Sequence, residues 1–345
     1  MIGGQGTAVR TTVQLDSSTV TAIGGLPHRD AVEAARVSLT QMDVPAIPSL
    51  PRRSPAEGSV AQAMVGMRGI TVGQYGSISL DPIRIDPLAP ISTDLQHDAF
   101  LGFRTFLAEA PRLRPGLEVV KWQFVGPVSF GLALVRAGLP ASLAFESAMR
   151  CVRARLQHLV DEVAAALPDA GQVVVLEEPA LADLMDPGFA LAPDVAIDLV
   201  SGALSAIESR ALVGLHICGV ADLPSQIDAG PGLISVPVHR SVLDAVGHLV
   251  RFMERGGRIA WGAVPTSGPI AASAERAWHN LNDLWCQMAE RGADLDLVRQ
   301  QALITPSCGL AAHSAGVAER VLCVAAEVGR RARHGGGGSH WRPGA

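Results

Sequence analysis

The stretch Gln172-Val-Val-Val-Leu-Glu-Glu178 is a short run of β-branched and leucine residues that ends in two carboxylates and is followed by Pro179. A run of this length and composition is typical of a β-strand. A segment with helical periodicity, 194–209, comes next, and a second apolar run occupies 211–216. We interpret the three segments as one strand–helix–strand unit, which favours an α/β fold.

The same alternation runs through the rest of the chain. Strands are expected at 19–23, 44–48, 117–124, 172–177, 211–216, 233–238, 258–264 and 302–306, with helices at 28–40, 139–166, 194–209, 241–254, 270–292 and 313–331. Eight such units predict a (β/α)8 TIM barrel with an insertion between strands 2 and 3, roughly 52–110. A doubly wound open sheet is the alternative, but no Gly-x-Gly-x-x-Gly turn follows the first strand.

Composition indicates one globular domain. We expect a flexible N-terminus at 1–17, a single barrel at 18–330 and a flexible Gly-rich tail at 331–345. The net charge of −5 and pI near 6.1 provide no basic field for nucleic acid. No apolar run is long enough to span a bilayer and no signal peptide is visible, so we expect a cytoplasmic protein.

Three residues of the chain have the spacing of a metal site. His216 and Cys218 lie two residues apart at the end of an expected strand, so their side chains point the same way, and Cys308 follows the last expected strand. Imidazole and thiolate are preferred zinc ligands. The alternative is that these residues are buried spacers, because free cysteines are often buried. The five cysteines are too few and too scattered to suggest a disulfide framework.

The expected barrel offers a test of this hypothesis. Active sites of such barrels lie at the carboxyl ends of the strands. Read in order, these ends carry polar and metal-binding residue types: Gly24-Gly25, Trp122-Gln123, Glu177-Glu178, His216-Ile-Cys218, His239, Thr266 and Cys308. His28, in the first loop, precedes the acidic start of a helix, and we expect it at the surface.

Several short motifs together resemble the catalytic half of cobalamin-independent methionine synthase, a family related to uroporphyrinogen decarboxylase-like barrels and corrinoid-dependent thiol methyltransferases. The resemblance spans roughly 19–325. It rests on Thr21-Ala-Ile-Gly-Gly-Leu-Pro27, Tyr75-Gly-Ser77, Gly126-Pro-Val-Ser129, Glu177-Glu-Pro-Ala-Leu181, His216-Ile-Cys218 and Cys308-Gly-Leu310, which occur in the order of the family's motifs.

The resemblance implies a zinc-dependent methyltransferase that acts on a thiol such as homocysteine, as in methionine biosynthesis. Zinc would be held by His216, Cys218 and Cys308, and would lower the pKa of the bound thiol. The expected substrate-binding residues are Ile23, Gly25, Tyr75, Ser77, Trp122 and Glu177, with Glu177 and Glu178 as the catalytic carboxylates. The carboxylates have a second interpretation as loop caps, and Trp122 has one as a core residue.

The chain also departs from the family pattern. Pro237 stands where the family has a glutamate zinc ligand, and His239, on the same face of the expected strand, is a candidate substitute. Ala133 and Ile78 replace a folate-stacking tryptophan and an arginine. The expected partners are therefore a small thiol and a methyl donor that is either methylfolate or a methylcorrinoid protein.

Two further hypotheses remain open at this point. The first is a non-catalytic or altered-specificity paralogue that binds a small thiol. The absence of the glutamate ligand is compatible with this hypothesis. The second is a metal-free barrel of the decarboxylase type. Decarboxylation of a polycarboxylate calls for several arginines in the pocket, and the expected strand ends carry almost none.

Overall fold

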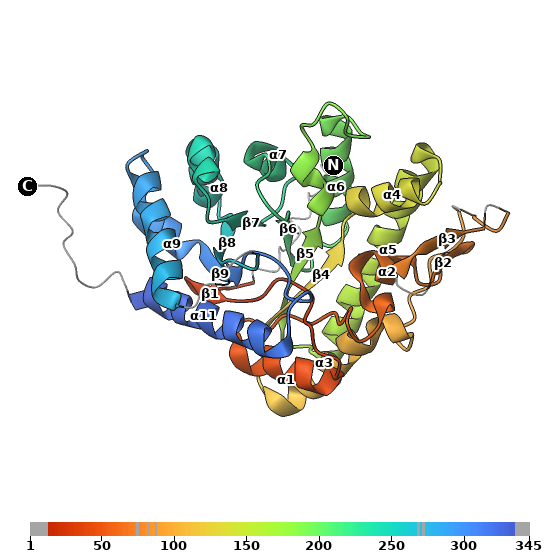
Figure 1. Ribbon diagram of the computed structural model, residues 1–345, viewed down its shortest axis with the longest axis horizontal. Helices are drawn as coiled ribbons and strands as arrows, with labels where there is room; N and C mark the ends of the chain where they lie inside the picture. The colour runs from red at the N-terminus through yellow and green to blue at the C-terminus, as the bar shows by residue number, and fades with distance from the viewer. Residues whose placement is uncertain are drawn as a thin grey trace, which may run out of the picture.

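The computed structural model describes residues 13–73, 76–81, 83–86, 88–267, 270 and 273–334. Its centre is a curled parallel sheet of seven strands in the order β1-β9-β8-β7-β6-β5-β4 (Figure 1). These strands are β1 Thr19–Val20, β4 Val119–Val125, β5 Gly171–Glu177, β6 Leu212–His216, β7 Leu233–Pro237, β8 Arg258–Val264 and β9 Ala302–Pro306. The α/β class and seven of the eight expected strands are thereby confirmed.

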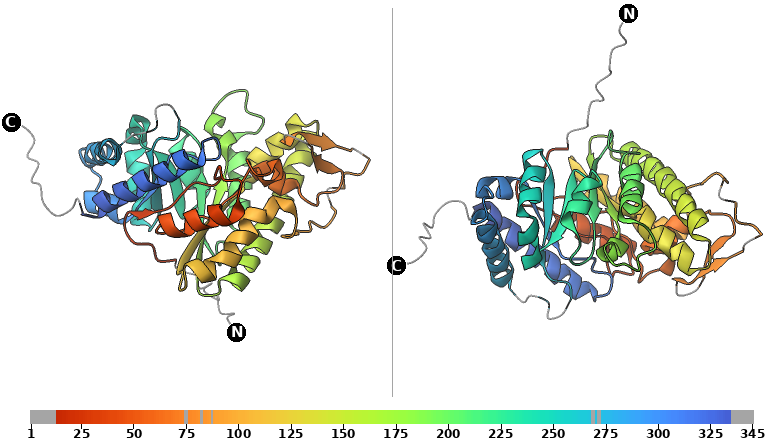
Figure 2. Two further views of the ribbon diagram at one scale, coloured as in Figure 1. Left: turned by 60° about the horizontal axis from the view of Figure 1, so that its bottom comes forward. Right: turned by 90° about the horizontal axis from the view of Figure 1, so that it is seen from above.

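Helices surround the sheet on its convex side (Figures 1 and 2). They are α1 Ala31–Gln41, α2 Ser59–Met64, α3 Leu101–Leu113, α4 Pro127–Arg136, α5 Ala141–Ala166, α6 Pro193–Leu204, α7 Leu223–Asp228, α8 Val246–Glu254, α9 Ala274–Ala289, α10 Leu295–Gln300 and α11 Ala315–His334. No helix in the described ranges combines the length and apolar character needed to cross a membrane.

The strand expected at 44–48 is wrong as a regular strand. The segment forms only an isolated parallel bridge between Ala46 and Lys121. It nevertheless contacts both edges of the sheet, because the Val44 amide donates to the Val20 carbonyl (3.0 Å) and the Lys121 amide donates to the Pro45 carbonyl (2.9 Å). The two prolines of this segment lack an amide hydrogen, which explains why no continuous ladder forms.

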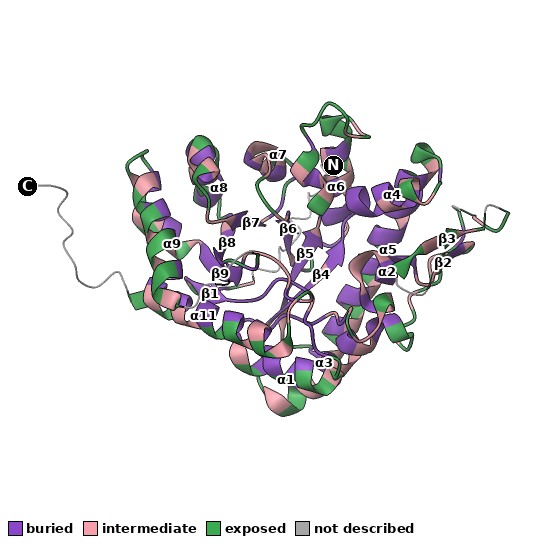
Figure 3. Cartoon of the chain, in the orientation of Figure 1, coloured by how far each residue is buried: buried purple, intermediate pink, exposed green. Residues whose placement is uncertain are grey.

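The two faces of the sheet bury different sets of side chains. Large apolar residues, including Trp122, Leu215 and Trp261, point outward into the core between sheet and helices, which Figure 3 shows as buried. The inner face carries a separate buried cluster that includes Val173 and Leu303. Because side chains alternate along a strand, this division fixes which residues point into the centre of the curled sheet.

The segment expected as an insertion contains α2 and an antiparallel hairpin formed by β2 Ile70–Val72 and β3 Ile78–Leu80. The hairpin lies at the periphery beside α2 and α5 (Figures 1 and 2).

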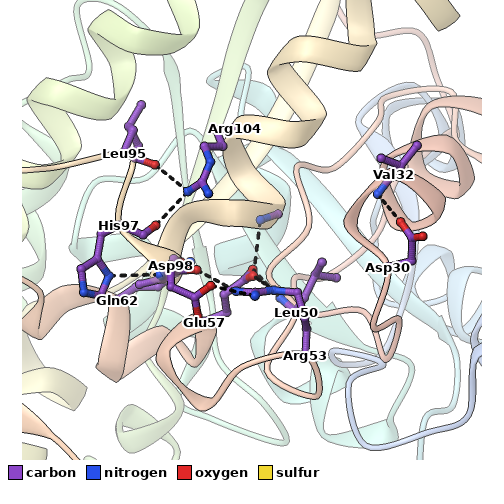
Figure 4. Close-up of polar contacts among 12 residues, drawn as sticks. Asp30, Val32, Leu50, Arg53, Glu57, Gln62, Leu95, His97, Asp98 and Arg104 are labelled. Carbon is purple, nitrogen blue, oxygen red and sulfur yellow. Dashed lines mark hydrogen bonds and ion pairs between the residues drawn. The ribbon is translucent and has the colours of Figure 1, made fainter.

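A buried carboxylate, Glu57, holds this segment against the rest of the fold (Figure 4). Its carboxylate accepts the amide of Leu50 (2.9 Å) and pairs with the Arg53 guanidinium (2.6 Å). Arg53 in turn bonds the carboxylate and the carbonyl of Asp98. Gly102 packs directly against the carboxylate: a Cβ there would lie 2.8 Å from Glu57 Oε2. The pair thus joins the loop after residue 48 to the start of α3.

Replacement of Glu57 by alanine is expected to lower the free energy of unfolding by about 3 kcal/mol, because it leaves the Nε–H of Arg53 and the buried amide of Leu50 without their acceptor. Urea denaturation monitored by circular dichroism would measure the change. The matched control is Arg112→Ala, which breaks the exposed pair with Glu109 and should cost under about 1 kcal/mol. Equal losses in the two variants would contradict this role for Glu57.

Candidate metal centre

His216, Cys218 and Cys308 converge at one point at the carboxyl end of the sheet. One ligand atom from each of the three lies within 4.8 Å of the others. His216 is the last residue of β6, Cys218 follows it by two positions, and Cys308 follows β9. His216 Nε2 lies 3.2 Å from Cys218 Sγ, so this ring nitrogen faces the thiols. The predicted grouping of the three residues is present in the structure.

The loop that carries Cys308 is held from both sides. The Thr266 amide donates to the Ser307 hydroxyl (3.1 Å) next to the cysteine. On the other side, the Leu310 amide donates to the Gly25 carbonyl (2.9 Å). The residues on either side of Cys308 are therefore held by the loops that contain Thr266 and Gly25. The Cys308 thiol itself is half-buried.

The two thiols polarise each other in opposite directions. A hydrogen bond from Cys218, together with one from His216, lowers the pKa of Cys308 and outweighs the opposing effect of burial. The pKa of Cys218 is raised by that same hydrogen bond, by burial and by the charges of Cys308 and Glu177. The opposite directions of the two pKa shifts make Cys308 the more readily ionised thiol of the pair.

Glu177 stands directly beside His216. The two residues are partners in the parallel register of β5 and β6, so their side chains leave the sheet on the same face. Gln123 on β4 fixes the Glu177 carboxylate by donating from Nε2 to Oε1 (2.7 Å). The carbonyl oxygen of the Gln123 side chain accepts from the Gly24 amide (2.7 Å) and from Lys121 Nζ (2.8 Å). With two donors on its oxygen, the amide of Gln123 has only one satisfactory orientation.

Lys121 supplies a cation to this network and is buried in the centre of the curled sheet. Burial lowers the pKa of Lys121 to about 8, and the charge of Glu177 opposes that shift in part. When Lys121 is ionised, its positive charge offsets the negative charge of the Glu177 carboxylate in the buried network.

Gly24 lets the network close. It has a φ of +48°, a region that favours glycine, and a Cβ at this position would lie 1.5 Å from Gln123 Nε2. Any side chain at residue 24 would therefore displace Gln123 and with it the Glu177 carboxylate.

Glu178 has a different environment from its neighbour. It is fully buried, and its carboxylate accepts the amides of Val128 (2.8 Å) and Ser129 (2.7 Å) at the start of α4. Burial raises the pKa of Glu178 to about 7, against the effect of the Ser129 and Val128 hydrogen bonds. A Cβ on Gly126 would lie 2.2 Å from this carboxylate. Glu178 thus anchors α4, the alternative role that the sequence left open.

Other predicted site residues lie in varied places. Ile23 lines the interior of the curled sheet, and Gly25 contacts the Cys308 loop through its carbonyl. Ser77 is exposed on the β2–β3 hairpin. Tyr75 lies outside the described residues.

Trp122 and His239 are not at the cluster. Trp122 is 1% exposed on the outer face, where its indole nitrogen donates to Gln172 (2.9 Å), because it is one residue out of phase with the inward-facing Gln123. His239 is exposed, and its Nδ1 accepts the Ser241 amide at the start of a short 3-10 helix. The expectation that His239 substitutes for the missing glutamate therefore has no geometric support among the described residues.

Neither the protein-family models nor the curated proteins contain a match to this sequence. Solved structures do match over most of the chain. A B12-independent methionine synthase from Shewanella sp. W3-18-1, in complex with selenomethionine, aligns with a TM-score of 0.57 and 16% identity over 92% of this chain and 99% of its own. The resemblance is one of fold.

A methyltransferase from Methanosarcina mazei aligns equally well, with a TM-score of 0.57 and 15% identity over 93% of this chain and 96% of its own. The chain therefore shares the fold of these solved structures. At sequence identities of 15–16%, the roles of individual residues in these structures do not transfer to this chain.

Proposed function

We propose that the protein is a zinc-dependent methyltransferase that transfers a methyl group to a small thiol. The observation that carries this proposal is the convergence of His216, Cys218 and Cys308 at the carboxyl end of a methyltransferase-like sheet. We also infer that the sheet is completed by the 44–47 segment to form an eight-unit barrel, with residues 52–110 as its insertion. Such a barrel has its active site at this end.

The three side chains suit zinc by their chemistry. One imidazole and two sulfurs form a soft donor set, and three protein ligands leave a position for substrate. The lowered pKa of Cys308, which follows from its hydrogen bonds with Cys218 and His216, favours a thiolate in this donor set. Zinc, when bound, lowers the pKa of a coordinated substrate thiol and so makes it a better nucleophile near neutral pH. Pro237 provides no further ligand, because proline has no donor side chain.

Glu177 gives the proposal its substrate class. Its carboxylate is half-buried, close enough to Cys218 to influence the thiol's pKa, and held rigidly by Gln123. Gln123 donates to Oε1, and a carboxylate has further lone pairs with which to accept from a substrate cation. An ammonium group is the natural partner for such a carboxylate. We infer an amino-acid thiol such as homocysteine, with its sulfur at the cluster and its ammonium at Glu177.

Ile23, Gly25, Tyr75 and Ser77 stay in the proposal as substrate-binding residues, whereas Trp122 and Glu178 are assigned to packing and to anchoring α4. The methyl donor is either methylfolate or a methylcorrinoid protein. Ala133 and Ile78, in place of bulkier or charged family residues, favour the corrinoid. The competing function is a paralogue that binds the thiol without turnover, which the same site geometry would permit.

The proposal is tested by measuring zinc content and methyl transfer together. Cys218→Ser and Cys308→Ser should each remove one zinc equivalent per chain and reduce methyl transfer to homocysteine by roughly 100-fold or more, because the ligand set loses a thiolate. Methylcobalamin and methylfolate would serve as alternative donors. Cys323→Ser, on the exposed face of α11, is the matched control and should change neither quantity.

The metal centre would be refuted if the wild-type protein bound no zinc, or if the zinc that it binds were unaffected by Cys218→Ser. Zinc binding without product from either donor would instead support the non-catalytic paralogue.

Replacement of Glu177 by glutamine should raise the KM for homocysteine by about 10-fold or more, because a charge-assisted hydrogen bond is worth roughly 1.5–3 kcal/mol. The KM for 2-mercaptoethanol, which has no ammonium group, should stay nearly constant. Gln123→Leu should produce a weaker effect in the same direction, since it frees the carboxylate to move. Glu118→Gln, exposed at the opposite end of β4, is the control. An equal rise in KM for both thiols would rule out an ammonium-binding role.

A further inference from the structure

His28 occupies an unusual position for a residue expected at the surface. It is 2% exposed, and the structure shows no hydrogen-bond partner for either ring nitrogen among the residues it describes. Buried polar atoms are normally satisfied, since an unpaired one costs free energy on folding. Both ring nitrogens of His28 are therefore buried without a hydrogen-bond partner among the described residues.

Two carboxylates approach this ring from different helices. Glu33 lies in the first turn of α1 and Glu319 lies near the start of α11, and one ligand atom from each falls within 4.8 Å of the others and of the imidazole. His28 Nε2 is 3.8 Å from Glu319 Oε1, which is too long for a hydrogen bond. The helices themselves lie side by side (Figures 1 and 2).

We propose that His28, Glu33 and Glu319 form a second divalent-cation site, suited to zinc, beside the His/Cys/Cys cluster. Imidazole nitrogen and carboxylate oxygen are both zinc ligands in proteins, with distances near 2.0–2.2 Å. A cation between Nε2 and Oε1 requires the two atoms to approach slightly, and the partly exposed Glu319 has the freedom to move. The fourth position is left to water, because Glu33 is exposed.

Charge favours a cation here over an anion. A neutral imidazole with two carboxylates carries a formal charge of −2, which a divalent ion cancels. The amino termini of α1 and α11 oppose a cation, but the partial charge of a helix end is smaller than two full charges. Asp30 is not a further ligand, because its carboxylate already caps α1 by accepting the amides of Val32 and Glu33 (Figure 4).

The location gives the site a structural purpose. His28 belongs to the loop that contains Gly25, and Glu319 belongs to the helix that follows the Cys308 loop. These loops already meet through the hydrogen bond from Leu310 to Gly25. A cation at the second site would join the first and last units of the fold next to the thiol cluster, and its binding would stabilise the folded chain.

The test is zinc stoichiometry, measured on full-length protein by equilibrium dialysis against buffered zinc followed by mass spectrometry. The wild type should bind two equivalents and the Cys218→Ser/Cys308→Ser variant one. Adding His28→Ala or Glu319→Gln to that variant should remove the last equivalent, and the glutamine keeps the side chain's size in case the alanine impairs folding. His279→Ala, which changes an exposed histidine 4.0 Å from Asp283, should leave it bound.

The proposal is overturned if the double cysteine variant binds no zinc, or if its remaining equivalent survives both His28→Ala and Glu319→Gln. The outcome is separable from that of the thiol centre. A wild type with one equivalent that depends on His28 but not on Cys218 would support this site and refute the zinc–thiolate centre.

Discussion

The parallel register between β5 and β6 is the constraint on which the site depends. It pairs Glu177 with His216, so that the carboxylate and the imidazole emerge side by side on the inner face. A shift of one residue would turn either side chain into the outer core. The close packing that holds β6 in place includes Gly214, where a Cβ would lie 2.9 Å from the Leu233 side chain. The geometry of the cluster is therefore a consequence of strand pairing rather than of the loops alone.

At β4, the inner face of the sheet carries a charged side chain and the outer face carries a large apolar one. Lys121 and Trp122 are neighbours in sequence, yet one enters a buried polar network and the other packs edge-on against Phe103. The cost of burying Lys121 is offset by its bond to Gln123 and by the charge of Glu177. A buried polar network of this kind is stabilising only when its members are satisfied, which gives it one preferred geometry. That rigidity suits the proposed role of Glu177, which is to hold a substrate's ammonium group at a fixed distance from its sulfur.

Much of the fold could be predicted from sequence because buried strands are recognisable as short apolar runs. The segment 44–48 failed this rule, since its prolines remove the amides that a ladder needs. The grouping of His216 with Cys218 and Cys308 could be predicted because His216 and Cys218 are two residues apart at the end of β6 and Cys308 follows β9 at the same edge of the sheet. The alternation of side chains along a strand, applied from Gln123, would have placed Trp122 in the outer core. Burial of His28 could not be foreseen, because it depends on α11, a helix almost three hundred residues away.

The division of labour between the two carboxylates also depended on tertiary structure. Glu177 and Glu178 are adjacent and chemically alike, but the first faces the cluster and the second meets the amides at the start of α4. The β5–β6 register places Glu177 beside His216, whereas Gly126 leaves room for the Glu178 carboxylate at the start of α4. Sequence identifies the pair, and packing assigns a role to each member.

The most direct measurement is zinc K-edge X-ray absorption on the Glu319→Gln variant, which removes one ligand of the proposed second site, loaded with less than one equivalent of zinc. Coordination by His216, Cys218 and Cys308 predicts about two sulfur atoms at roughly 2.3 Å and one or two nitrogen or oxygen atoms near 2.0–2.1 Å. Addition of homocysteine should increase the sulfur count by one. A first shell of nitrogen and oxygen alone would contradict the thiolate centre and, with it, the proposed activation of a substrate thiol.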